Sequence, residues 1–151
     1  MFHLFYIYIK LQHRNLLLNL YKKNVHNVQK ITYIICIIKT KGIKIMKKIG
    51  LFYGSSSDNT KTAAEFIAEY LEMNDVEVES FDIADCDLEK IMEFDNIIIG
   101  CPTWNIGELQ EDWDAVFLNY QELDFKDKTA AFFGCGDQVG YPDNFLDAIG
   151  I

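Results

Sequence analysis

The sequence has few of the residues that mark several common protein classes. It contains two prolines and nine glycines among 151 residues, which excludes a collagen-like or low-complexity chain. Its four cysteines, Cys36, Cys86, Cys101 and Cys135, show no C-x-x-C spacing, so we expect free thiols and neither a disulfide scaffold nor a metal centre. The longest uncharged apolar run, residues 31–38, is far below the ~18 residues of a membrane-spanning helix. We therefore expect no transmembrane segment.

Histidine and basic residues are scarce after residue 45. All three histidines lie before that point, with eight of the 14 Lys and Arg residues and no acidic residue. Residues 46–151 thus carry six basic and 23 acidic residues, a net charge of −17. Such a domain is repelled by nucleic acid and by anionic membranes. We expect macromolecular partners with basic surfaces.

Residues 1–45 differ in composition from the rest of the chain. Ile, Leu, Lys, Asn, Tyr and Phe make up 32 of these 45 residues, and Ala, Ser and Pro are absent. A transit peptide is rich in Ser and Arg, and a secretory signal ends in small residues, so neither description fits well. We expect Met46 to be the true start and the preceding stretch to have no fold. A degenerate targeting segment and a functional arm are the alternatives. The expected location is the cytoplasm, or the plastid stroma if the segment is a targeting peptide.

From residue 46 onward, apolar runs alternate with amphipathic segments. The runs 49–53, 97–101 and 129–134 are typical of strands buried on both faces of a parallel sheet, whereas 76–79 alternates as an edge strand does. Apolar side chains at helical spacing predict two helices, and short helices are expected near 88–94 and from about 145. The two stripes are Ala63, Phe66, Ile67, Tyr70 and Leu71, and Trp113, Val116, Phe117 and Tyr120. The pattern predicts an α/β doubly wound parallel sheet of order 2-1-3-4, with ligands bound at the switch point between its first and third strands.

Three loops follow the strands that meet at this switch point. The first, GSSSDNT (54–60), leads into a helix whose N-terminus can bind a phosphate, although serines here can also serve only as helix caps. It matches neither the triphosphatase loop nor the dinucleotide fingerprint. The other two loops each present one large aromatic residue, Trp104 and Tyr141. Alone, each is a partly buried hydrophobe or a partner contact. Together with the first loop they predict a slot for a flat conjugated ring with a phosphate tail.

The sequences PTWNIGELQ (102–110) and GDQVGYPDN (136–144) resemble those of flavodoxins of the long-chain type, and the resemblance covers essentially all of residues 46–151. It implies a flavodoxin-like fold, the cofactor flavin mononucleotide (FMN), and a low-potential carrier of single electrons that is not an enzyme. The resemblance also implies which residues bind FMN. They are Ser55, Ser56, Ser57, Asp58, Asn59 and Thr60 at the phosphate; Trp104 and Tyr141 on the two faces of the ring; Thr103, Cys135 and Asn144 near the ribityl chain and ring edge; Asn105, Ile106 and Gly107 at flavin N5; and Gly136 and Asp137 at the pyrimidine end.

Two features of the sequence modify this expectation. Asp58 stands where the family usually has glycine, and we expect its backbone to adopt a left-handed conformation and its carboxylate to point to solvent. Six acidic residues lie in or beside the flavin loops, either as a solvated face or as a guide for basic redox partners such as a ferredoxin-NADP reductase. They are Glu108, Glu111, Asp112, Asp114, Asp137 and Asp143.

Three other interpretations compete with that of an electron carrier, which we expect to be monomeric. An FMN-dependent NAD(P)H:quinone oxidoreductase shares the fold but needs an exposed flavin face. A phospho-acceptor receiver domain needs acidic residues where this chain has Ser55 and Cys101-Pro102. The third is a non-functional fragment, because the family's last strand and closing helix are absent after Ile151. Without them, about five apolar side chains would be uncovered, which would lower the free energy of unfolding by about 10 kcal/mol. The whole free energy of unfolding of a domain is only ~5–15 kcal/mol. We therefore expect poor folding and weak flavin binding.

Overall fold

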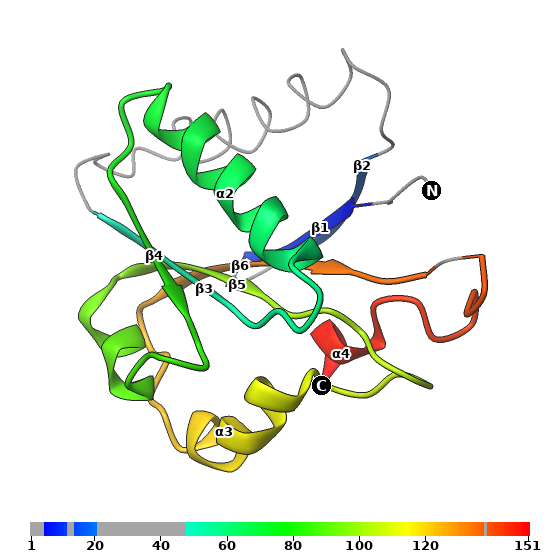
Figure 1. The fold of residues 1–151 in the computed structure, drawn as a ribbon. Coiled ribbons are helices and arrows are strands. Elements are labelled where there is room, and N and C mark those ends of the chain that lie inside the picture. The colour runs from blue at the N-terminus through cyan, green and yellow to red at the C-terminus, as the bar shows by residue number, and fades with distance from the viewer. Residues whose placement is uncertain (1–4, 12–13, 21–47, 138) are drawn as a thin grey trace.

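One six-stranded sheet forms the centre of this computed structural model, which describes residues 5–11, 14–20, 48–137 and 139–151 (Figure 1). Its described strands are β1 (Phe5–Leu11), β2 (Arg14–Leu20), β3 (Ile49–Tyr53), β4 (Val78–Asp82), β5 (Asn96–Gly100) and β6 (Thr129–Cys135). They lie in the order β2-β1-β6-β5-β3-β4. The last four strands in this order are parallel to one another. This confirms the predicted α/β class and, counted from residue 46, the predicted order 2-1-3-4.

The burial of β3 and β4 follows their sequence patterns, whereas the run 129–134, predicted to be buried on both faces, is only partly buried over residues 129–132. All five residues of β3, which lies between β5 and β4, are buried, as expected for a continuous apolar run with helices on both faces. In β4 no residue is fully buried, and β4 is an edge strand. The predicted boundaries differ slightly, because β5 begins and ends one residue early and β4 lies at 78–82.

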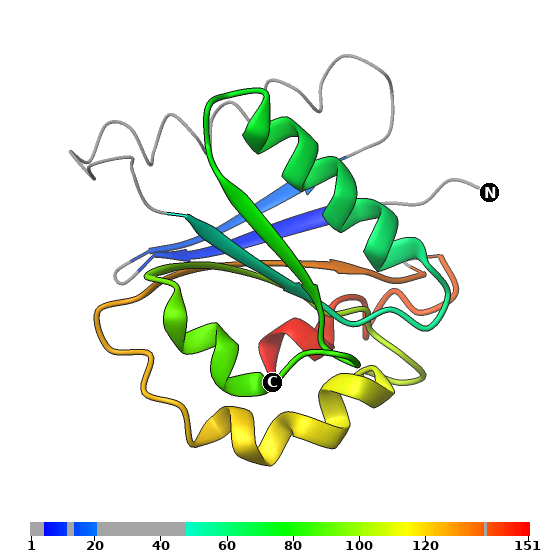
Figure 2. The same ribbon diagram turned by 60° about the vertical axis from the view of Figure 1, so that its left-hand side comes forward.

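Helices cover both faces of the sheet. They are α2 (Asn59–Glu72), the 3-10 helix η1 (Leu88–Glu93), α3 (Glu111–Gln121) and α4 (Asp147–Gly150). Helix α2 lies on one face, and η1, α3 and α4 lie on the other (Figure 2). Successive side chains of β3 pack against opposite helix layers. Leu51 packs with Ala63 and Ala64 of α2. Phe52 packs on the other face with Ile91 and Trp113.

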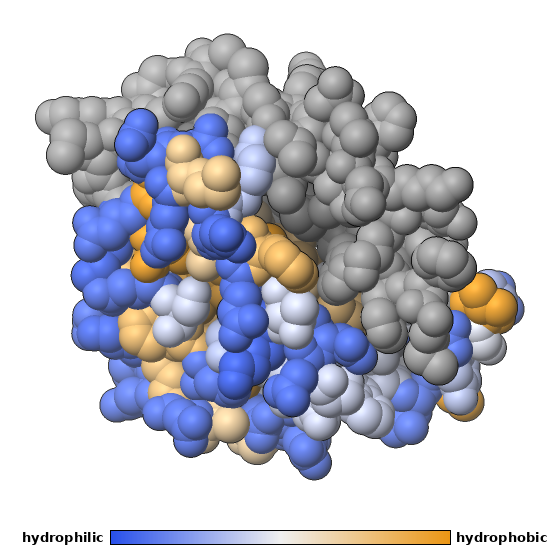
Figure 3. Space-filling view, turned by 45° about the horizontal axis from the view of Figure 1, so that its top comes forward, coloured by the Kyte–Doolittle hydropathy of each residue, from blue (hydrophilic) through white to orange (hydrophobic). Residues whose placement is uncertain are grey.

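The prediction that the apolar stripe of α2 is buried is wrong for one of its residues. Phe66 is 62% exposed, whereas Ala63 and Leu71 are buried. Helical spacing determines the direction of a side chain, but burial also needs an element opposite it. On the α2 side, apolar residues interrupt an otherwise hydrophilic described surface (Figure 3).

The first 20 residues contain structure that the sequence did not predict. Strands β1 and β2 pair antiparallel, and β1 pairs antiparallel with β6, with Phe5 opposite Cys135 and Tyr8 opposite Phe132. The expectation that residues 1–45 have no fold therefore differs from the structure at 5–11 and 14–20. The remainder of this segment, including residues 21–45, lies outside the described residues. Strand β1 covers the edge of β6, which would otherwise present unpaired backbone groups.

Candidate functional site

Three loops leave the sheet side by side at the carboxyl ends of β3, β5 and β6. Backbone hydrogen bonds join each of two loops to the last residue of the neighbouring strand, from Gly54 N–H to Gly100 O (3.1 Å) and from Thr103 N–H to Cys135 O (3.0 Å). The loops that follow are 54–58, 101–110 and 136–146. These loops carry thirteen of the sixteen predicted flavin-binding residues, and the other three, Asn59 and Thr60 of α2 and Cys135 of β6, adjoin them.

The first loop ends at the N-terminus of α2. Asp58 precedes the helix with φ 58° and ψ −1°, and its side chain makes no capping hydrogen bond and is exposed. These features agree with the expectation for an aspartate in the place of glycine. The Ser55 hydroxyl accepts the Lys61 N–H (3.3 Å), and Asn59 Nδ2 donates to Ser57 Oγ (3.2 Å). Because the first turn of α2 contains no acidic residue, this helix end is suited to an anion.

Three predicted site residues already have partners inside the protein. Thr60 is 1% exposed, and its side chain hydrogen-bonds to the buried Cys135 thiol. Thr103 Oγ1 accepts the Ala148 N–H (3.3 Å). These groups therefore join α2, β6 and α4 beneath the loops.

Residues 104–108 form a tight turn at the tip of the second loop. Trp104 and Glu108 exchange two backbone hydrogen bonds of 3.0 and 2.8 Å. Asn105 and Gly107 have φ values of 46° and 90°, so the glycine occupies a conformation that a side chain would strain. Asn105 Nδ2 donates to Glu108 Oε2 (2.5 Å). Trp104 is 41% exposed and Ile106 is 73% exposed, so the turn presents apolar side chains to solvent.

The third loop is folded around Asp137. The Asp137 carboxylate accepts the N–H groups of Val139 (3.0 Å) and Gly140 (2.9 Å), and its carbonyl accepts the Tyr141 N–H (3.0 Å). This side chain thus shapes its own loop. Tyr141 is 51% exposed, which leaves part of its ring free for a ligand.

Two further predicted residues lie at the ends of this loop. Gly136 packs closely beneath Phe145, since a Cβ at Gly136 would lie 3.1 Å from that ring. Asn144 Nδ2 donates to Asp147 Oδ2 (3.1 Å) at the start of α4. Residue 138 lies outside the described residues.

The acidic cluster divides between two places in the fold. Glu111, Asp112 and Asp114 lie in the first turn of α3, where the helix dipole favours negative charge. Glu108 precedes α3, and Asp137 and Asp143 lie in the third loop. None of the ion pairs within the described parts of the chain, which involve Lys48 and Lys90, includes a member of this cluster. Its charge is therefore not neutralised by those lysines.

Sequence reasoning missed one residue of the site. Gln110 is 0% exposed and is the N-cap of α3. Its side chain reaches the first loop, where Nε2 donates to Ser56 Oγ (3.1 Å). A glutamine at an N-cap, where Ser, Thr, Asp or Asn is usual, is the signal in the sequence that could have drawn attention to it.

The buried thiols predict a loss of stability at alkaline pH. Burial raises the pKa of both Cys101 and Cys135 from 9.0 to about 11. In the unfolded chain these thiols ionise at lower pH, so their stabilising contribution is complete below about pH 9 and declines as the pH rises to about 11. We expect the free energy of unfolding in urea to fall between pH 9 and pH 11. A Cys101→Ala/Cys135→Ala variant should show a shallower decline over that interval, and an identical decline would contradict the prediction.

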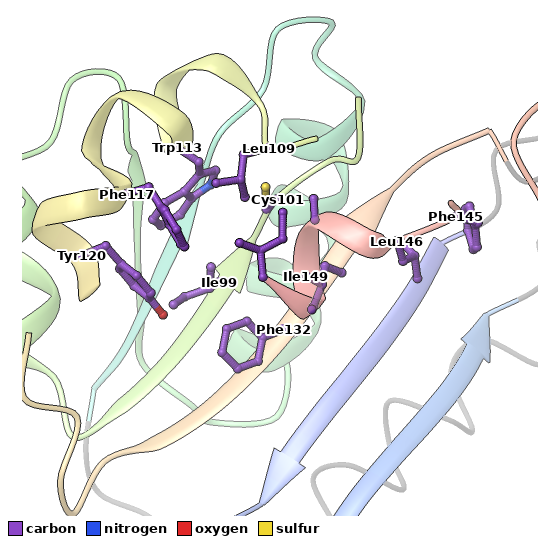
Figure 4. Close-up of a pocket in the computed structure, with 13 residues that line it drawn as sticks. Ile99, Cys101, Leu109, Trp113, Phe117, Tyr120, Phe132, Phe145, Leu146 and Ile149 are labelled. Carbon is purple, nitrogen blue, oxygen red and sulfur yellow. The ribbon is translucent and has the colours of Figure 1, made fainter. Parts of the chain in front are cut away.

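A separate cavity of about 590 Å³ lies on the α3 side of the sheet. Trp113, Phe117 and Tyr120 of α3 point into it, with Phe132 of β6 and Ile149 of α4 opposite (Figure 4). It shares no residue with the predicted flavin site. The sequence did not predict this cavity.

Residues 5–11, 14–20, 48–137 and 139–151 contain neither a membrane-spanning helix nor a metal site. No helix there is long and apolar enough to cross a membrane. No group of three or more His, Cys, Asp or Glu side chains there could bind a metal ion. Cys86, Cys101 and Cys135 are free thiols, as predicted, and Cys36 lies outside the described residues.

Comparison with known proteins identifies similar sequences. The family model described as Flavodoxin matches residues 51–151. A flavodoxin of Picosynechococcus sp. is 52% identical over 106 residues, which cover 70% of this chain and 62% of that protein. A flavodoxin of Haemophilus influenzae is 45% identical over 105 residues, covering 70% and 59%. The chain thus spans about 60% of the length of these curated relatives.

Solved structures are similar in the same region. The Fusobacterium nucleatum flavodoxin bound to flavin mononucleotide matches with a TM-score of 0.64 and 28% identity, over 70% of this chain and 61% of that one. Oxidised flavodoxin 2 of Bacillus cereus matches with a TM-score of 0.63 and 33% identity, over 68% and 69%. These likenesses support the fold assignment and the resemblance inferred from the sequence.

Proposed function

This chain belongs to the flavodoxin family, and from that premise we propose that it binds FMN and carries single electrons between redox proteins. One observation carries the proposal. The exposed aromatic residues Trp104 and Tyr141 lie on two loops that leave the same edge of the sheet as the loop into α2. A ring held by the two aromatics could therefore place its phosphate tail at a helix N-terminus.

The phosphate end of FMN fits the residues of the first loop. The loop offers the Ser55, Ser56 and Ser57 hydroxyls, and Asn59 and Thr60 open the helix. A helix N-terminus presents unpaired N–H groups and the positive end of the dipole, both of which favour a phosphate. The exposed Asp58 carboxylate is the one unfavourable group in this loop.

The ring end fits the other two loops. Trp104 and Tyr141 provide flat apolar surfaces for stacking. The turn at residues 105–107 can form a backbone hydrogen bond with the edge of the ring. FMN, when bound, accepts and releases electrons one at a time. The acidic residues around the loops disfavour additional negative charge on the ring, which makes the carrier strongly reducing. Electron transfer through bound FMN needs no catalytic acid, base or nucleophile from the chain.

Stepwise reduction of the FMN-loaded chain tests this function. The purified chain is titrated with FMN, followed by the quenching of flavin fluorescence, and is then reduced with dithionite under argon. We expect a yellow protein that passes through a long-lived blue, paramagnetic species. Flavin fluorescence that stays unquenched when the chain is in large excess over FMN would contradict FMN binding. NADPH consumption without an added reductase would favour the quinone oxidoreductase alternative.

The acidic cluster supports a basic redox partner, of which a ferredoxin-NADP reductase is an example. The six residues lie in the loops around the proposed ring site and at the start of α3. Opposite charges accelerate encounter, and salt screens that attraction. Electron-transfer rates with such a reductase should therefore fall as ionic strength rises. Rates independent of salt would favour a solvated face, and light scattering tests the expected monomer.

We further propose that residues 46–151 form the FMN-binding unit. The three loops lie between residues 54 and 146, and β1 contacts β6 along residues 132–135. A chain starting at Met46 should keep its FMN dissociation constant within about twofold, because no loop is removed. Its melting temperature should fall, because the edge of β6 loses its antiparallel partner. A folded Met46 chain without FMN affinity would contradict the assignment.

Asp58→Gly is expected to tighten FMN binding by about three- to tenfold. Two unit charges ~5 Å apart repel by about 3 kcal/mol at an effective dielectric constant of ~20, and exposure of the Asp58 carboxylate reduces this repulsion. Asp75→Gly is the matched control, since Asp75 also has a positive φ (62°) but follows the other end of α2, ~20 Å away. Titration with FMN and with riboflavin, which lacks the phosphate, measures the effect. Equal FMN affinities of wild type and Asp58→Gly would contradict the prediction.

A further inference from the structure

The buried Gln110 side chain connects the start of α3 to the loop that precedes α2. Its Oε1 accepts the Trp113 N–H (3.4 Å), and its Nε2 donates to Ser56 Oγ (3.1 Å) and to Asp112 Oδ2. Since Gln110 is 0% exposed, an unpaired amide here would lose its hydrogen bonds to water without replacement. Both Nε2 protons and one lone pair of Oε1 are thus engaged by these three partners.

These partners determine the orientation of the Gln110 amide. A flipped amide would place Oε1 against the Asp112 carboxylate and Nε2 against the Trp113 N–H, so both contacts would become repulsive. The amide NH₂ group must therefore face Ser56. The fit is also tight on the other side, because a Cβ at Gly54 would lie 2.2 Å from Gln110 Oε1.

Because Gln110 Nε2 donates to Ser56 Oγ, the Ser56 hydroxyl keeps its own proton for another acceptor. A serine hydroxyl has one proton to donate, and Gln110 occupies an acceptor position of the Ser56 oxygen. The proton remains available, and in this structure it is donated to Glu111 Oε1 (3.3 Å). Glu111 and Ser56 are both exposed, so a phosphate oxygen can replace the carboxylate at little cost.

We propose that Gln110 is a positioning residue that holds the Ser56 hydroxyl ready to donate to the phosphate of the ligand. This rests on the proposed FMN site and adds a specific consequence. Gln110, from outside the phosphate loop, increases the preference of the chain for FMN over riboflavin. It acts through Ser56, so the two residues form one unit.

The test measures the ratio of the riboflavin and FMN dissociation constants in the full chain. Gln110→Met has a similar volume but no hydrogen-bonding amide, and we expect it to reduce the ratio about tenfold, as for the loss of one hydrogen bond to a charged group. Ser56→Ala should reduce it by the same factor, and the double variant by no more than either single one. Gln121→Met, at the exposed end of α3, is the matched control and should leave the ratio unchanged.

The outcomes separate this inference from the proposed function. A wild-type chain that binds FMN no better than riboflavin would overturn the phosphate site itself. A wild-type preference that Gln110→Met retains, or effects of Gln110→Met and Ser56→Ala that simply multiply, would overturn the positioning role alone. Gln110→Asn keeps an uncharged amide that can still cap α3, but its side chain is one methylene shorter and loses the bond donated to Ser56 Oγ. It should also reduce the ratio, and it decides the question if Gln110→Met does not fold.

Discussion

Replacing Trp104 and Tyr141 together by alanine is expected to raise the FMN dissociation constant about 100-fold or more. An aromatic side chain that stacks on a heteroaromatic ring contributes about 1–3 kcal/mol, and about 1.4 kcal/mol corresponds to a factor of ten in affinity. Trp104 is 41% and Tyr141 is 51% exposed, so both rings have surface available to a ligand. Quenching of flavin fluorescence in a titration measures the change.

Phe66→Ala provides the control for this double variant. Phe66 is an aromatic residue on α2 that is 62% exposed, and it lies outside the three loops. Its replacement should leave FMN affinity unchanged, which distinguishes stacking from a general effect of losing an exposed aromatic ring. Wild-type affinity in the Trp104→Ala/Tyr141→Ala variant would contradict the proposed ring slot.

Trp113→Ala is expected to lower the free energy of unfolding by about 3–5 kcal/mol. Trp113 is 4% exposed, its Nε1 donates to Gly100 O (2.9 Å), and its ring meets that of Tyr120 edge-on with centroids 5.8 Å apart. The change leaves a large void between α3 and the sheet. The free energy of unfolding of a whole domain is only ~5–15 kcal/mol, so the midpoint of urea unfolding should be much lower.

Two further substitutions separate packing from hydrogen bonding at this position. Trp113→Phe keeps an aromatic ring but leaves the buried Gly100 carbonyl without the indole donor, so we expect a loss of about 1–3 kcal/mol. Leu118→Ala lies on the same helix at 77% exposure and should change stability by less than about 0.5 kcal/mol. Equal midpoints for Trp113→Ala and Leu118→Ala would contradict the packing role.

Much of the fold was predictable because its signals are local. The apolar run at 49–53 coincides with β3, and the stripe that includes Trp113 and Tyr120 lies on α3. The alternating segment near residue 78 correctly indicated an edge strand. Strand order followed from these elements and the rule for right-handed crossovers. The same order placed the three candidate loops at one edge of the sheet.

Other features depend on residues far apart in the chain. The stripe of α2 predicted a buried Phe66, but no described element covers that ring, and it is 62% exposed. The pairing of β1 with β6 joins segments more than 120 residues apart. Such pairing depends on which sheet edge is free, and no local pattern encodes that.

By itself the sequence determined the fold class, the family and the loops that carry Trp104, Tyr141 and the serines. The spacing of apolar residues, the turn residues and the loop motifs all involve residues that are close together in the chain. Only the tertiary structure decided that Gln110 contacts Ser56, 54 positions away, and that β1 lies against β6. The physical reason is that burial and hydrogen bonding are properties of surfaces brought together by folding. A buried amide acquires its partners only when the sheet has placed both loops at one edge.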